Sequence, residues 1–161
     1  MDISSGVLFL SFKGLILAGI LGGLIGSERE WAQKSAGTRT FSFISLGAAL
    51  FIIISRLSFE GYLGVSNLDP SRILGQIIVG VGFLGAGIII FQPREGAIKN
   101  LTTAAMMWVA AAIGAAVGLE LYWIAVFSTL LVLFINIVIF PIEHKMEKRI
   151  QRIKDNKKEE V

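Results

Sequence analysis

Five apolar stretches, each about long enough to cross a lipid bilayer, dominate this sequence of 161 residues. They cover residues 6–26, 40–57, 73–91, 101–119 and 121–140. A helix rises about 1.5 Å per residue, so about 20 residues span the ~30 Å hydrocarbon layer. A hydrophobic content of 54% also leaves too few polar residues to cover a soluble core. The sequence therefore predicts an all-α integral membrane bundle of five transmembrane helices, embedded in lipid.

The last two apolar stretches are separated by one charged residue. Between residues 101 and 140 only Glu120 carries a charge. This segment is too long for a single crossing, so Gly118, Leu119 and Glu120 are expected to form a tight turn. We predict a transmembrane domain over residues 1–141, followed by a short basic tail helix over residues 142–161.

Basic residues fall mostly on one side of the predicted membrane. Of the 15 Lys and Arg residues, all but three lie in the loops after the first and third stretches or in the tail. Arg56 and Arg72 lie on the opposite side, and Lys13 is expected to snorkel from within the first stretch. Because cytoplasmic loops are rich in Lys and Arg, we predict an outside N-terminus and a cytoplasmic C-terminus. The same topology explains the net charge of +3 without nucleic-acid binding.

Small residues recur at four-residue intervals in the predicted helices. Such stripes let a second helix approach closely, so bundle packing is their simplest role and a homo-oligomer, a dimer, is the alternative. The third stretch also contains a G-x-G-x-x-G match, but it lies inside a spanning segment and not between a strand and a helix. A dinucleotide site is therefore rejected. The glycines assigned to helix packing are Gly22, Gly26, Gly80, Gly82, Gly85, Gly87, Gly114 and Gly118.

Polar residues gather at the predicted inner ends of the helices. Interfacial anchoring and helix capping explain many such residues, and a functional inner mouth is the alternative. We expect Glu28, Arg29, Arg39 and Thr103 to share one hydrogen-bonded site, and Asn100 to cap the fourth helix with its side chain. The inner polar cluster comprises Glu28, Arg29, Arg39, Thr40, Asn100, Thr102 and Thr103.

A second polar set lies at the predicted outer entrance of the third stretch. Asp69, Arg72 and Gln76 follow one another at about one helical turn. We expect Asp69 to cap the helix and to pair with Arg72. The Gln76 amide lies where lipid offers no hydrogen bonds, so it needs a partner.

The residues offer little for catalysis or metal binding. There is no cysteine, and the one histidine, His144, lies in the tail. No Ser/His/Asp set, paired-carboxylate site or P-loop is recognisable. Magnesium prefers carboxylate oxygens in octahedral geometry, and no carboxylate lies deep within a predicted helix. We predict no catalytic residues, no metal site, no cofactor and no enzymatic activity.

Six short motifs follow one another along the chain: GGLIGSERE (22–30), GTRT (37–40), LGAALF (46–51), DPSRI (69–73), GVGFLGAG (80–87) and LTTAAMMW (101–108). In this order they resemble the MgtC/SapB family, over about residues 14–118. One departure is Asn100, which stands where that family is expected to carry glycine. The resemblance implies a bacterial inner-membrane protein connected with magnesium homeostasis and adaptation to low magnesium. Many relatives carry a small cytoplasmic ACT-like domain, which is expected to be absent here.

Two functions remain open at this point. The first is a regulator or interaction protein that uses the inner polar cluster and binds another inner-membrane protein. The second is a small channel or carrier for magnesium or another solute, formed by a dimer whose third and fourth helices line the route. Flux through liposomes containing the purified protein distinguishes the two.

Overall fold

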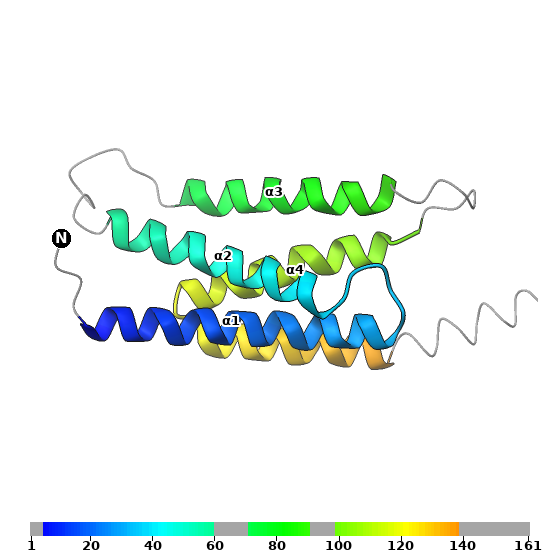
Figure 1. Cartoon of the computed structure of the whole chain (residues 1–161), viewed down its shortest axis with the longest axis horizontal. Helices are drawn as coiled ribbons and strands as arrows, with labels where there is room; N and C mark the ends of the chain where they lie inside the picture. The colour runs from blue at the N-terminus through cyan, green and yellow to red at the C-terminus, as the bar shows by residue number, and fades with distance from the viewer. Residues whose placement is uncertain (1–4, 60–70, 91–98, 139–161) are drawn as a thin grey trace, which may run out of the picture. The chain divides into compact units, whose positions relative to one another are not determined.

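The computed structural model describes residues 5–59, 71–90 and 99–138, which form five helices (Figure 1). Helix α1 spans Ser5–Trp31, α2 spans Thr38–Phe59, α3 spans Ser71–Ile90 and α4 spans Leu101–Gly118. A fifth helix covers Tyr122–Val138. Four of the helices are long and apolar enough to cross a membrane, which confirms the predicted all-α membrane architecture. The predicted tail, residues 142–161, lies outside the described residues.

Helices α1 and α2 extend beyond their apolar stretches at both ends. Helix α1 continues to Trp31, past the predicted boundary at Gly26, because polar residues can continue the backbone hydrogen bonds into the membrane interface. Trp31 and Trp123 are each 88% exposed. They lie at opposite ends of the helices, the positions that exposed tryptophans favour at the two membrane interfaces.

Residues 1–129 form one compact unit, which contains α1 to α4 and the beginning of the fifth helix. Consecutive helices of α1 to α4 run in opposite directions (Figure 1). Helix α2 packs along both α1 and α4, whereas α3 contacts mainly α4 and has a smaller contact with α2. Residues 130–161 form a second unit, and its described part, residues 130–138, is apolar apart from Asn136 and continues the fifth helix.

The centre of the first unit is built on backbone contacts at glycines. A Cβ added at Gly22 of α1 comes within 2.7 Å of the Ser45 Cβ of α2. A Cβ added at Gly114 of α4 overlaps the backbone carbonyl of Ser45, and one at Gly118 lies 2.8 Å from the Ile52 Cβ. Three helices therefore approach within backbone contact around Ser45, which is fully buried.

The glycines of α3 are placed differently. A Cβ added at Gly85 lies 3.4 Å from the Ala104 Cβ of α4, and one at Gly82 lies 3.9 Å from the Trp108 Nε1. At Gly80 and Gly87 an added Cβ meets no atom within 4 Å. Only Gly85 is thus buried against a neighbouring helix, and a packing role for Gly80 and Gly87 stays a prediction.

The predicted tight turn after α4 is confirmed. The Glu120 N–H donates to the Val117 carbonyl and the Leu121 N–H to the Ala116 carbonyl, both at 2.9 Å. Glu120 has a left-handed backbone, with φ 63°. These features define a Schellman motif, which satisfies the last carbonyls of a helix while reversing the chain. The Glu120 carboxylate also accepts a 2.6 Å hydrogen bond from Arg56, which ties the turn to the end of α2.

Candidate functional site

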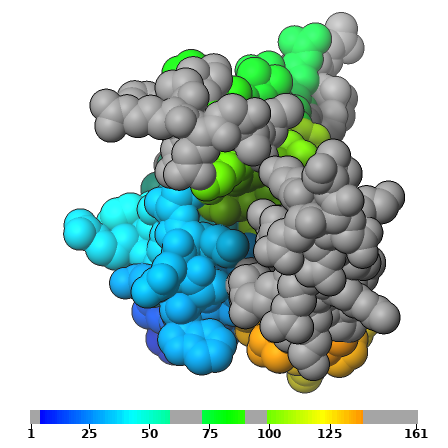
Figure 2. Space-filling model, turned by 90° about the vertical axis from the view of Figure 1, so that its right-hand side faces the viewer, coloured from blue at the N-terminus to red at the C-terminus, as the bar shows by residue number. Residues whose placement is uncertain are grey.

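Helix α1 ends at the place where α2 and α4 begin, and we call this place the Arg29 end. In Figure 2, which faces the Arg29 end, atoms of α4 lie beside those of α1 and α2. A second Schellman motif reverses the chain after α1. The Lys34 N–H donates to the Arg29 carbonyl and the Gln33 N–H to the Glu30 carbonyl, with Gln33 left-handed at φ 54°. This turn brings the first residues of α2 back against α1.

Glu30 caps the start of α2 from the end of α1. Its Oε2 accepts hydrogen bonds from the Thr38 N–H at 3.0 Å and from the Thr38 hydroxyl at 2.7 Å. A carboxylate at a helix N-terminus satisfies an otherwise unpaired N–H and interacts favourably with the helix dipole. A Cβ added at Gly26 would lie 2.6 Å from the Thr38 Cα, so glycine is needed for this approach. Sequence spacing does not indicate this capping role of Glu30, because a loop separates Glu30 from Thr38.

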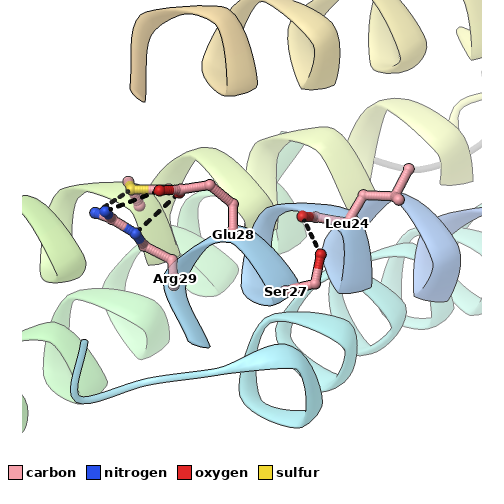
Figure 3. Close-up of polar contacts among 5 residues, drawn as sticks. Leu24, Ser27, Glu28 and Arg29 are labelled. Atoms are coloured by element: carbon pink, nitrogen blue, oxygen red, sulfur yellow. Dashed lines mark hydrogen bonds and ion pairs between the residues drawn. The ribbon is translucent and has the colours of Figure 1, made fainter. Parts of the chain in front are cut away.

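Arg29 lies at the centre of a buried polar contact, which we call the Arg29 cluster and define as Glu28, Arg29 and Met106 (Figure 3). The Arg29 Nη2 donates to the Glu28 Oε1 at 3.2 Å, and Nε lies 3.0 Å from Oε2. The Arg29 Nη1 donates to the Met106 Sδ at 3.2 Å. The guanidinium therefore connects the end of α1 to the second turn of α4.

The electrostatics of this cluster are those of a buried ion pair. Arg29 is only 2% exposed, and the Glu28 side chain is 12% exposed. Burying a charge is unfavourable unless an opposite charge and hydrogen bonds compensate it. The compensation is incomplete here, because the Nε contact lacks hydrogen-bond geometry and a thioether is a weak acceptor. The cluster thus pairs one negative with one positive charge and connects α1 to α4, but the Arg29 Nε has no hydrogen-bond acceptor among the residues that the structure describes.

The other members of the predicted inner polar cluster divide into two groups. Thr103 is buried one turn before Met106 on α4. Arg39, Thr40 and Thr102 are exposed and lie outside the Arg29 cluster. Arg39 is exposed whereas Arg29 is buried, and a hydrogen-bonded site that includes Arg39 stays a prediction.

Asn100 begins α4, but not in the way predicted. Its side chain makes no capping hydrogen bond, which corrects the expected side-chain cap. Its backbone is left-handed, with φ 68° and ψ 13°. Glycine adopts this conformation most easily, and asparagine tolerates it better than most other residues. This backbone conformation explains why asparagine can occupy the position at which the resemblance predicts glycine.

We expect Asn100→Gly to preserve or slightly raise stability and Asn100→Val to lower it by about 1–2 kcal/mol, because a β-branched residue strongly disfavours the left-handed region. Thermal unfolding of the two purified variants in the same detergent measures the difference. Equal stability of the glycine and valine variants would show that the left-handed backbone is not required.

The predicted outer set is only partly described. Arg72 and Gln76 lie one turn apart on α3, and both are exposed. Asp69, their expected neighbour, lies outside the described residues, so its pairing with Arg72 stays a prediction. Gln76 is exposed within the membrane-spanning part of α3.

The Arg29 end combines a buried ion pair with an exposed basic rim. Lys34, Arg39 and Lys99 are exposed around it. The part of the chain that the structure describes contains no group of three or more His, Cys, Asp or Glu side chains that could hold a metal ion. The arrangement can clamp helices together and present positive charge to a partner or to lipid headgroups.

The fold and the Arg29 cluster define a helical membrane protein whose buried charges lie at one end of close-packed helices. The chain belongs to the MgtC family, whose family model matches residues 15–145.

Three relatives illustrate the similarity. "Putative magnesium transporter YhiD" of Escherichia coli K12 is 45% identical over 123 residues, covering 75% of this chain and 56% of the relative. Protein MgtC of Salmonella typhimurium LT2 is 38% identical over 165 residues, covering 96% of this chain and 67% of the relative. Protein slr0014 of Synechocystis is 40% identical over 133 residues, covering 82% of this chain and 53% of the relative. The chain thus spans little more than half the length of the Escherichia coli relative, and no solved structure matches it.

Proposed function

We propose that this chain acts as a non-enzymatic regulator in adaptation to low magnesium, and that it acts through contacts made at the Arg29 end. The proposal rests on the position of the polar groups. The ion pair between Glu28 and Arg29 sits at the end of the helices, beneath an exposed basic rim. Such a surface suits an interaction with an acidic membrane partner.

The packing between α1, α2 and α4 supports a regulator over a carrier that conducts through this interface. Gly22 and Gly114 bring two helices into backbone contact with α2 around the buried Ser45. A hydrated magnesium ion keeps its water tightly, so its passage would require these helices to separate. The proposed topology, with the Arg29 end in the cytoplasm, rests on the distribution of basic residues.

A magnesium carrier is the second candidate. The printed name of the Escherichia coli relative refers to magnesium transport, and this favours the candidate. A route in that case would involve a dimer, with the glycine-rich helix α3 and helix α4 at the interface. Family membership supports a magnesium-related membrane protein under either proposal.

The test combines growth and flux. Arg29→Lys keeps the positive charge but loses the planar fork that pairs with Glu28. We expect this variant to reduce growth support in low magnesium, whereas Arg39→Lys, an exposed matched control, retains it. Thermal stability in detergent establishes whether both variants remain folded.

Magnesium flux into proteoliposomes then separates the two candidates. Under the regulator proposal, flux through wild-type and variant protein equals that of protein-free vesicles. Saturable, protein-dependent flux that Arg29→Lys abolishes would contradict the regulator and favour the carrier.

A further inference from the structure

An apolar groove of about 740 Å³ lies between α2 and α3. Phe43, Gly47 and Phe51 line it from α2, and Gln76, Gly80 and Leu84 are among its residues on α3. Its volume falls within the roughly 300–1,000 Å³ typical of small-molecule sites. The groove exists because α2 and α3 share only a small contact and carry glycines where they face each other.

The length of the groove matches one leaflet of a bilayer. Its lining on α3 runs from Ile73, near the start of the helix, to Leu84. At about 1.5 Å per residue this distance is roughly 16 Å, about half of the ~30 Å hydrocarbon layer. A transmembrane helix packed along α3 would contact the whole helix, whereas an acyl chain extends through one leaflet only.

The polar groups lie at one end of the groove. Gln76 places an amide in an otherwise apolar lining and makes no hydrogen bond to any residue that the structure describes. Arg72 lies one turn closer to the start of α3 and is exposed. An amide followed by a guanidinium, at the membrane-surface end of an apolar groove, fits an amphiphile with an anionic headgroup.

We infer that the groove between α2 and α3 binds an anionic phospholipid, with one acyl chain along Gly47 and Gly80 and the headgroup at Gln76 and Arg72. This site is separate from the Arg29 end and does not depend on the proposed regulatory role. A bound lipid fills the space that the small contact between α2 and α3 leaves, and it supplies the hydrogen-bond partner that Gln76 needs in the membrane.

The test uses the full chain in phosphatidylcholine vesicles that contain a phospholipid with a photoreactive diazirine in its acyl chain. The probe is supplied either as phosphatidylglycerol or as phosphatidylcholine, and mass spectrometry maps the labelled residues. We expect labelling on both walls of the groove, about fivefold stronger for the anionic probe. We expect Arg72→Ala to remove that preference.

Gly80→Leu fills the groove, and its added Cβ meets no atom within 4 Å, so the helices can accommodate it. Gly75→Leu is the matched control, because Gly75 also faces open space but does not line the groove. We expect Gly80→Leu to reduce groove labelling to the level of the exposed Phe127, and Gly75→Leu to leave it unchanged. Gly47→Leu repeats the test from α2 if the Gly80 variant does not fold.

Three results would overturn the inference. The first is groove labelling that persists in both Gly80→Leu and Gly47→Leu. The second is equal labelling by the two probes in the wild-type protein. The third is efficient cross-linking between the groove residues of two chains, because it would identify a second copy of the protein as the occupant.

Discussion

Replacing Gly114 by leucine is expected to prevent normal assembly of the helices and to lower the stability of the protein by more than about 3 kcal/mol. Even the first side-chain atom at this position overlaps the backbone carbonyl of Ser45, and a backbone cannot move aside as a flexible side chain can. Helices α2 and α4 must therefore separate. Thermal unfolding in detergent and the amount of protein accumulated in the membrane measure the effect.

Gly87→Leu is the matched control for this experiment. It introduces the same side chain into α3, at a position where an added Cβ meets no atom within 4 Å. We expect its stability to remain within about 0.5 kcal/mol of wild type. Similar unfolding temperatures for the leucine variants at Gly114 and Gly87 would mean that the contact between α2 and α4 contributes little to the fold.

Replacing Arg29 by leucine is expected to lower stability by about 3 kcal/mol, because it removes the positive charge that pairs with the Glu28 carboxylate in a buried ion pair. Glu28 is the residue left behind, and its side chain is only 12% exposed. We expect the double variant Glu28→Gln with Arg29→Leu to lose less stability than the two single variants lose together. The difference in the free energy of unfolding should be about 1 kcal/mol or more. Chemical or thermal unfolding of the four proteins in one detergent measures this coupling.

Arg39→Leu tests whether burial is the cause. Arg39 is exposed at the same end of the helices, so its replacement should change stability by less than about 0.5 kcal/mol. A loss at Arg39 equal to that at Arg29 would indicate a general effect of basic residues at this end. Additive losses at Glu28 and Arg29 would show that their contact is not energetically significant.

The helices were predictable because the membrane imposes a length and a composition on any segment that crosses it. The tight turn at Glu120 was predictable for the same reason, since the apolar segment around it is too long for one crossing. The ends of the helices were less predictable. Polar residues such as Glu28 and Arg29 continue α1 into the interface, where hydropathy no longer marks a boundary.

The Arg29 cluster was predictable only as a region. Adjacent residues on a helix do not normally face each other, so sequence spacing does not indicate the pairing of Glu28 with Arg29. From the sequence, Met106 is an ordinary apolar residue of a helix. Its thioether accepts a hydrogen bond from Arg29 only because α1 and α4 meet at this end. Glu30 caps α2 through a turn, which local capping patterns do not predict.

The sequence by itself determined that this is a helical membrane protein, approximately where its helices begin and end, and which family it resembles. These properties depend on hydropathy and on short motifs, which are local. Only the tertiary structure decided that Arg29 is buried while Arg39 is exposed, and that Gly114 contacts another backbone while Gly80 faces an open groove. The physical reason is that burial and close approach depend on which helix lies opposite each residue. The type of a residue does not specify that neighbouring helix.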